Sequence, residues 1–192
     1  VHPLLERARI AGALPIPVFR SSSSESYLNA CKRFLTWSEN KCGCLRVSLD
    51  DIEAIKTGEE LKGFMSLVGA RAKESVLIID AGPLSISEEE ELATLIAYQI
   101  SRLVRPMDWA CVIFSVTSFP ESPKISPWSS ESFDRSDWIL YREMYRIRDE
   151  FSVFPVFSDY GLEYPANYKP IQVQPVAHLR YSTENKYFIF KG

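Results

Sequence analysis

The chain has 192 residues, of which 46% are hydrophobic and 24% are charged, and its formal net charge at pH 7 is −3. This length suits one well-packed domain better than two, and the composition is that of an ordinary globular protein. The slightly acidic balance excludes the general electrostatic attraction to nucleic acids and anionic membranes that basic proteins show. No stretch contains the roughly 18 apolar residues that a membrane-spanning helix needs.

The first half of the chain alternates between short apolar runs and segments with helical spacing. Strands are predicted at residues 14–20, 44–49 and 75–82, and the last is a continuous apolar run typical of a buried parallel strand. Helices are predicted at residues 27–37 and 50–69, the second with Asp50 or Asp51 as its N-cap and with Gly58 dividing it in two. The serines of residues 21–26 lack the glycines of a phosphate-binding loop and are interpreted as a flexible linker.

The second half continues the alternation and ends in a hairpin. A helix is predicted at residues 85–104, with Ser87 as its N-cap and an acidic first turn that suits the positive end of the helix dipole. A strand at residues 109–116 leads into a long Pro- and Ser-rich connection at residues 117–136. A helix at residues 136–147, with Ser136 as N-cap, a strand at residues 154–161 and the final hairpin complete the chain.

Strands that alternate with helices predict a parallel sheet with right-handed crossovers. An open doubly wound sheet and most of a (β/α) barrel both fit, although a complete eight-stranded barrel typically takes ~250 residues. We therefore predict a single α/β domain over residues 1–192, (β/α)-barrel-like and not necessarily complete, which a C-terminal β-hairpin closes.

The cysteines and histidines do not have the spacing of a metal site. None of the cysteines forms a C-x-x-C pair, and the two histidines are not placed as a ligand pair beside them. We expect reduced thiols, a cytoplasmic protein and no metal, and the sequence names no cofactor. The residues are Cys31, Cys42, Cys44, Cys111, His2 and His178.

Charged and polar side chains gather where the predicted strands end. In both candidate architectures ligands bind at the carboxyl ends of parallel strands. One interpretation is a buried ion network that closes the sheet, because charges among apolar strands are costly unless paired. In the other, the arginines hold an anion and Asp80 or Asp159 acts as a base or a metal ligand. The strand-end residues are Arg20, Arg46, Ser48, Asp80, Ser115, Thr117, Ser118, Asp159 and Tyr160, with Arg180 and Tyr181 in the hairpin.

Other candidate residues give weaker evidence of a function. No G-x-S-x-G motif occurs, neither histidine has a clear nucleophile partner, and His178 is interpreted as a packed or edge residue, which disfavours Ser-His-Asp catalysis. In the long connection, Trp128 and Phe133 lie among polar residues and are interpreted as a partner surface or a lid. Trp138 is interpreted as part of the helix core.

Several short motifs, in order, resemble the phage-type Beta protein family. They are "SFP" at residues 118–120, an R-x-x-W formed by Arg135 and Trp138, "DYG" at residues 159–161, "LRYST" at residues 179–183 and a final "KG". Ser158 stands where the family more often has glycine. The resemblance runs from about residue 14 and covers the C-terminal part of the longer family members, so we expect a chain without their N-terminal portion, as the initial Val1 also suggests. The family positions carried over are Ser118, Phe119, Pro120, Arg135, Trp138, Asp159, Tyr160, Gly161, Arg180, Tyr181, Lys191 and Gly192.

The resemblance implies a barrel-like fold and an origin in phages or in bacterial antiviral defence regions, but it supplies no biochemical activity. We expect a protein that binds or acts on an anionic small molecule or nucleotide at the carboxyl ends of its strands. The alternative is a non-enzymatic protein-interaction module that uses residues 117–138. Candidate catalytic residues are Asp80 and Asp159; candidate ligand-binding residues are Arg46, Ser118, Arg135, Tyr160, Arg180 and Tyr181; candidate partner-binding residues are Trp128 and Phe133.

Overall fold

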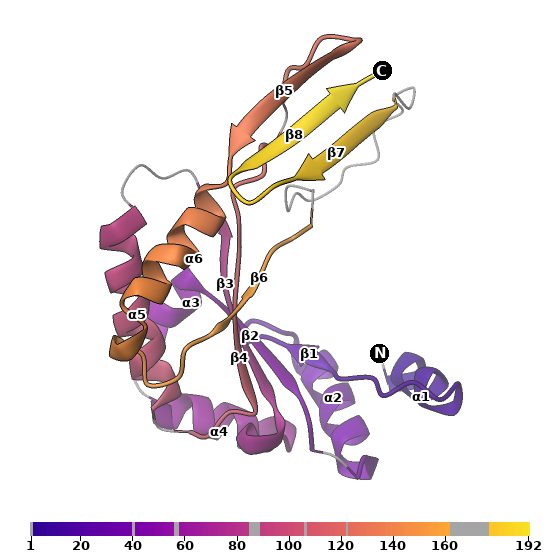
Figure 1. Cartoon of the computed structure of the whole chain (residues 1–192). Helices are drawn as coiled ribbons and strands as arrows, with labels where there is room; N and C mark the ends of the chain where they lie inside the picture. Colours follow the sequence, from indigo (N-terminus) through magenta and orange to yellow (C-terminus); the bar gives the residue numbers. More distant parts are fainter. Residues whose placement is uncertain are drawn as a thin grey trace. The chain divides into compact units, whose positions relative to one another are not determined.

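The computed structural model describes residues 2–39, 41–55, 58–84, 89–105, 107–121, 123–161 and 177–192. Helices and strands alternate through most of this range (Figure 1). The helices are α1 (His2–Ile10), α2 (Glu25–Trp37), α3 (Leu49–Ala54), α4 (Gly58–Val68), α5 (Glu89–Val104) and α6 (Ser136–Arg146), with 3-10 turns at Ala72–Glu74 and Arg148–Glu150. The strands are β1 (Val18–Phe19), β2 (Cys44–Ser48), β3 (Val76–Pro83), β4 (Cys111–Thr117), β5 (Ser129–Asp134), β6 (Val156–Ser158), β7 (His178–Ser182) and β8 (Lys186–Lys191).

The described residues form two sheets. The first is a parallel five-stranded sheet in the order β1-β2-β3-β4-β6, and the second is antiparallel in the order β5-β8-β7. The alternation of parallel strands with helices confirms the predicted α/β class. The C-terminal hairpin forms as predicted, but it pairs with β5 in the second sheet. Among the described residues, β1 and β6 each have one strand neighbour in the first sheet.

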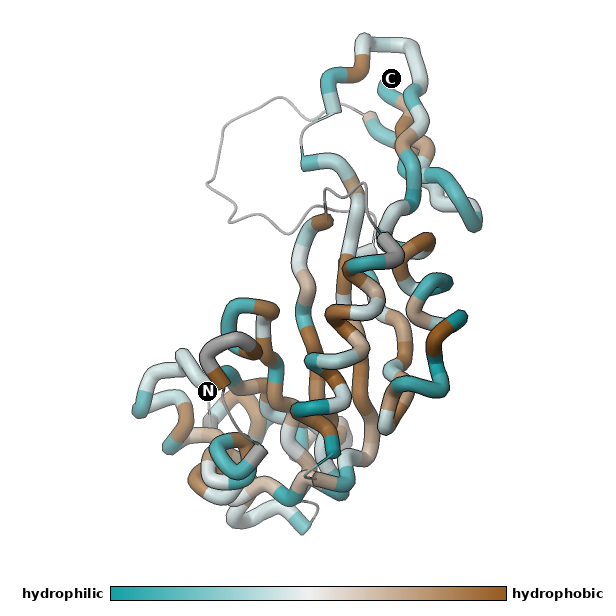
Figure 2. The backbone as a smooth tube through the Cα atoms, turned by 90° about the vertical axis from the view of Figure 1, so that its left-hand side faces the viewer, coloured by the Kyte–Doolittle hydropathy of each residue, from teal (hydrophilic) through white to brown (hydrophobic). Residues whose placement is uncertain are grey.

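The chain divides into two compact units. The first comprises Val1–Asp80, Ile96–Phe114 and Arg148–Phe157, and the second comprises Ala81–Leu95, Ser115–Ile147 and Ser158–Gly192. Figure 2 shows that long hydrophobic stretches follow the strands of the five-stranded sheet, as burial of a parallel sheet requires.

The first unit is built on apolar spacing that the sequence displays. Cys31, Phe34 and Leu35 form the buried stripe of α2, at the i, i+3, i+4 positions that share one helix face. This helix packs against α1 and α4. On the sheet side, Phe19 is buried and its ring lies 5.9 Å from that of Phe64 in α4.

The second unit has its own small core. Phe119, Ile125, Tyr187 and Ile189 form a buried cluster, and the half-buried Phe133 packs against it. Because side chains alternate along a strand, Tyr187 and Ile189 bring one face of β8 to this cluster. The second sheet therefore has one face on a core and one face toward solvent.

Several helix starts differ from the sequence predictions. The N-cap of α3 is Ser48, not Asp50 or Asp51: the Ser48 hydroxyl accepts a hydrogen bond from Asp51 N (3.1 Å), and Asp51 Oδ2 accepts one from Ser48 N (2.9 Å). This capping box forms because the chain passes from β2 into the helix without a loop. At α6 the N-cap position is Arg135, without a side-chain cap, and Ser136 is the first helical residue.

Other differences concern loops and turns. The division of residues 50–69 into two helices is confirmed, whereas the predicted cap Ser87 lies outside the described residues. The serine segment expected to be a linker begins α2, with Ser24 as its N-cap. The connection expected to be a loop contains β5, whose polar sequence "SSESFD" becomes a strand because β8 supplies its backbone partners.

Candidate functional site

A pocket of about 320 Å³ opens in the first unit beside the carboxyl end of β1. Arg20 directly follows that strand, and Arg46 comes from the neighbouring strand β2. The turn before α2 and the first turn of that helix supply the remaining polar side chains. The pocket is lined by Val18, Arg20, Ser23, Ser24, Tyr27 and Arg46.

Local hydrogen bonds fix the shape of this pocket. The Ser23 hydroxyl accepts a hydrogen bond from Arg20 N (3.0 Å), and the Ser24 hydroxyl accepts one from Tyr27 N (3.4 Å). The Tyr27 hydroxyl donates to Val18 O (2.6 Å), which joins α2 to the strand. Burial and the neighbouring Cys31 raise the pKa of Tyr27, so its hydroxyl stays protonated at neutral pH.

Asp80 lies between the two arginines. Arg46 Nε is 2.7 Å from Asp80 Oδ2, and Arg46 Nη2 contacts the same oxygen. Arg20 Nη2 is more distant, at 3.9 Å. The side chains are 11% exposed for Asp80, 31% for Arg46 and 47% for Arg20. The mostly buried Asp80 thus fixes the position of Arg46 by an ion pair, while Arg20 is the most exposed of the three side chains.

The strand register explains this pairing. Ser48 lies opposite Asp80 in the β2–β3 ladder, and Arg46 is two residues before Ser48, so all three side chains share one face of the sheet. A carboxylate and a guanidinium on the same face at this offset are within reach of each other.

A second carboxylate lies close to Arg20. The Ser21 hydroxyl donates to Asp51 Oδ1 (3.2 Å). Burial acts to raise the pKa of Asp51, but the hydrogen bonds from Ser48 and Ser21 and the charge of Arg20 outweigh it, so its pKa is lowered. Asp51 therefore stays ionised and completes the capping box of α3 as its N3 residue.

In the second unit, the most buried charged group is Asp137, in the first turn of α6, which has no solvent exposure. Its Oδ1 accepts a hydrogen bond from the Ser118 hydroxyl (2.7 Å), and its Oδ2 accepts one from the Tyr187 hydroxyl (2.7 Å). Arg135 Nη2 donates to the same Oδ2 at 3.3 Å. The carboxylate is therefore compensated on both oxygens, which is the condition for burying a charge.

Arg135 connects this buried network to a more exposed residue. Its Nη1 donates to Thr183 O (3.2 Å), and its guanidinium carbon lies 5.0 Å from the centre of the Tyr187 ring. Its Nη2 is 3.7 Å from Asp159 Oδ2, and the Asp159 side chain is 35% exposed. Burial and the hydrogen bond to Asp137 raise the pKa of Tyr187, which remains a neutral donor. The network joins the end of β4, the start of α6 and β8, and the Asp159 side chain is more exposed than that of Arg135.

The comparisons with known proteins fit the motifs in this part of the chain. The family model described as "Beta protein" matches residues 1–192. The chain belongs to the Beta protein family. Its match includes the residues before position 14, where the resemblance first becomes visible in the sequence. No curated protein and no solved structure matches the chain.

Three family-marked residues meet in the Asp137 network. Ser118, Arg135 and Asp159 come from three separate motifs, and the structure brings them together around a carboxylate that the sequence analysis did not select. Because these groups are already bonded to one another, the arrangement stabilises the second unit. Their roles in binding a ligand or in catalysis stay predictions.

The predicted strand-end residues separate into two groups. Arg46 and Asp80 pair directly in the first unit, whereas Asp159 and Arg180 belong to the second. Arg180 lies over the Phe119 ring, with its guanidinium carbon 5.4 Å from the ring centre. Because neighbours on a strand point to opposite faces, Tyr181 points away from Arg180 and is exposed.

The remaining predicted residues also have distinct places. Tyr160 is half-buried. Phe133 packs on the Phe119 cluster, while Trp128 is 88% exposed. His178 lies on the edge strand β7, as the sequence suggested. Trp138 is half-buried, with its ring stacked on that of Tyr141 at a centroid distance of 5.6 Å.

Sequence reasoning missed the serines of the first pocket and the centre of the second network. Ser23 and Ser24 were visible as a serine run between a strand end and a helix, a signal for a cap as well as for a linker. Asp137 and Tyr187 carried no such signal, because a single Asp in a first helical turn and a Tyr in an apolar strand are both ordinary.

Within the described ranges, no group of three or more His, Cys, Asp or Glu side chains has the arrangement of a metal site. No helix in those ranges has the length and apolar character needed to cross a bilayer. The four cysteines are free thiols, and burial raises the pKa of Cys44 to about 11.

Proposed function

We propose that this protein binds a small anionic molecule, such as a phosphate or carboxylate compound or a nucleotide, in the pocket beside β1. The observation that carries the proposal is the pocket itself: two guanidinium groups and two serine hydroxyls line one space of about 320 Å³. That volume lies at the lower end of the range found for small-molecule sites, ~300–1,000 Å³.

The electrostatics of the pocket support an anion. Its lining contains Arg20 and Arg46, and none of the described residues that line it is acidic. Guanidinium groups match the oxygens of carboxylates and phosphates two at a time. Asp80 stands behind Arg46 and orients it, which acts as preorganisation, whereas Arg20 keeps the exposure that a ligand needs. The N-terminus of α2 adds a positive potential at the same place.

The strand order supports a barrel-like arrangement as part of this proposal. The order β1-β2-β3-β4 follows the chain without the reversal that marks a doubly wound sheet. In a (β/α) barrel, active sites lie at the carboxyl ends of the strands, where this pocket opens. Asp80 in the first unit and Asp159 in the second remain the proposed catalytic candidates should the protein act on a substrate. The proposal also keeps the role in phages or antiviral defence that the resemblance implies.

The test combines native mass spectrometry with thermal shift. Gently purified protein is weighed for a bound small molecule, and melting is followed with added inorganic phosphate, citrate and ATP. Arg20→Ala is the test variant, because Arg20 is half exposed and only distantly paired. Arg33→Ala is the matched control, since Arg33 is exposed on the same α2 helix and does not line the pocket.

The proposal predicts an anionic adduct, or a melting shift with at least one of the three anions. Arg20→Ala should reduce the affinity for this anion at least tenfold, whereas Arg33→Ala should leave the affinity unchanged. Binding that both variants retain would place the ligand elsewhere. The absence of any adduct and any shift would leave Arg46 and Asp80 as a structural ion pair and would overturn the proposal.

A further inference from the structure

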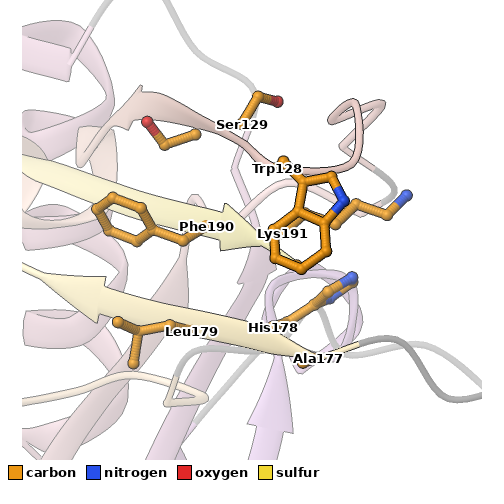
Figure 3. Close-up of a pocket in the computed structure, with 9 residues that line it drawn as sticks. Trp128, Ser129, Ala177, His178, Leu179, Phe190 and Lys191 are labelled. Carbon is orange, nitrogen blue, oxygen red and sulfur yellow. The ribbon is translucent and has the colours of Figure 1, made fainter.

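A second hollow, of about 500 Å³, lies at one end of the antiparallel sheet β5-β8-β7. We call it the Trp128 hollow; it is lined by Trp128, Ser129, Ser130, Ala177, His178, Leu179, Phe190, Lys191 and Gly192. Figure 3 shows Leu179 and Phe190 on adjacent strands, with Trp128 near Lys191 at the end of the sheet. All of these residues belong to the second unit, so this hollow is independent of the anion pocket.

The apolar part of the hollow continues along the solvent face of the sheet. Leu179 lies directly opposite Phe190, and two residues further along Tyr181 lies opposite Phe188. The alternate residues of β8, among them Ile189, are buried against the core. Cross-strand pairs of this kind form an apolar stripe, and Leu179, Tyr181 and Phe190 are all exposed in the described structure.

Trp128 adds an unusual feature. Its φ is 60°, and it is the one non-glycine residue with positive φ among the described residues. A left-handed backbone is unfavourable for a bulky residue, because its Cβ crowds the following carbonyl oxygen. The indole is 88% exposed and gains little from burial in return. Backbone strain that no buried packing of the side chain offsets is typical of residues that contact a ligand or a partner.

The charges around the hollow have one sign. Lys191 and His178 are directly opposed in the β7–β8 ladder, on the sheet face opposite to that of Leu179 and Phe190. At the end of the sheet they line the same hollow, where they supply an ammonium group and an imidazole. Among the described residues, none that lines the hollow is acidic, although the chain as a whole carries a net charge of −3. The complementary occupant is therefore apolar next to an acidic group.

The strand arrangement selects an extended occupant. In the order β5-β8-β7, β7 pairs with no second strand in the part of the chain that the structure describes. An edge strand beside an apolar stripe is the geometry used when an extended peptide adds a strand to a sheet. A second copy of this chain fits less well, because its own hollow would bring Lys191 and His178 against the same groups.

We propose that the Trp128 hollow and the edge of β7 bind an extended segment of a partner protein that carries an acidic side chain next to apolar ones. The apolar side chains contact Trp128, Leu179 and Phe190, and the carboxylate pairs with Lys191. This places the protein-interaction role on one of the two loop aromatics selected from the sequence, since Phe133 belongs to the core.

The test uses a library of random twelve-residue peptides displayed on phage and selected on the immobilised chain, followed by affinity measurement with the synthetic winners. Two variants alter the hollow: Trp128→Gly, which also relieves the positive φ, and Lys191→Glu. Two matched controls change the same residue types elsewhere, Trp37→Ala at the exposed end of α2 and Lys32→Glu on its surface.

We expect winners enriched in Asp or Glu beside aliphatic or aromatic residues, with affinity reduced at least tenfold by each hollow variant and unchanged by either control. Trp128→Gly must melt no lower than the parent, which separates lost contact from lost folding. An unenriched library, winners without acidic residues, or winners that bind the hollow variants normally would overturn the proposal. Self-association that Trp128→Gly abolishes would also overturn it, in favour of a second copy.

Discussion

The Asp137 network offers a sharp test of how the second unit is held together. The perturbation is a double-mutant cycle between Asp137→Ala and Tyr187→Phe. Both side chains are fully buried, and the Tyr187 hydroxyl donates to Asp137 Oδ2 at 2.7 Å. The cycle asks whether this hydrogen bond contributes to stability as a pair, beyond the packing of each side chain.

The magnitudes follow from what each change removes. Tyr187→Phe removes one hydrogen bond to a charged acceptor, which is worth about 1.5–3 kcal/mol. Asp137→Ala removes the bonds from Ser118, Tyr187 and Arg135. It leaves Arg135, whose side chain is 11% exposed, with Thr183 O and with the more distant carboxylate of Asp159. Removing one partner of a buried ion pair costs about 3–5 kcal/mol.

The expected coupling is about 1.5–3 kcal/mol, because the shared hydrogen bond is lost in both single variants and is counted once in the double variant. Urea denaturation followed by tryptophan fluorescence and circular dichroism measures the free energies of unfolding. Costs that add to within about 0.5 kcal/mol would refute the reasoning. If Asp137→Ala does not fold, Ser118→Ala replaces it, since it keeps the carboxylate and removes the hydrogen bonds of the Ser118 hydroxyl with Asp137 Oδ1, Asp137 N and Asp134 O.

Two further predictions concern the first unit. Gly43→Ala should lower the free energy of unfolding by about 1–3 kcal/mol, because a Cβ there would lie 2.7 Å from the buried Phe19 ring. The control is Gly63→Ala in the open part of α4, which should raise the free energy of unfolding by up to about 1 kcal/mol. Equal effects of the two changes in chemical denaturation would contradict the packing argument. Asp51 has a lowered pKa in the folded state, so its stabilising effect is present above the unfolded value of about 3.9 and is lost as pH falls through the folded value. Asp51→Asn should therefore lower the free energy of unfolding by about 1 kcal/mol at pH 7 and by progressively less below pH 4. Melting curves of both proteins across this pH range measure the difference. A difference in stability that stays constant with pH would show that the charge of Asp51 plays no part.

The sequence by itself determined the order and the type of most elements. Apolar runs at residues 44–49, 75–82 and 109–116 coincide with β2, β3 and β4, because a buried parallel strand must be apolar over most of its length. The spacing of apolar residues located α2 and α6, because residues three and four apart share one face of a helix. The short motifs also identified the family, which the match over residues 1–192 shows.

Only the tertiary structure decided which distant residues meet. The "SSESFD" segment has no strand signal of its own and becomes β5 through its pairing with β8. Asp137 acquires Ser118 and Tyr187 from segments 19 and 50 residues away along the chain. The sequence predicted that Arg46 and Asp80 lie near each other because both are at strand ends. The strand register in the tertiary structure is what places both side chains on the same face of the sheet. Local spacing encodes which face of an element is apolar, whereas pairing between distant segments depends on the free energy of the whole fold, and that is why the pocket and the network required the structure.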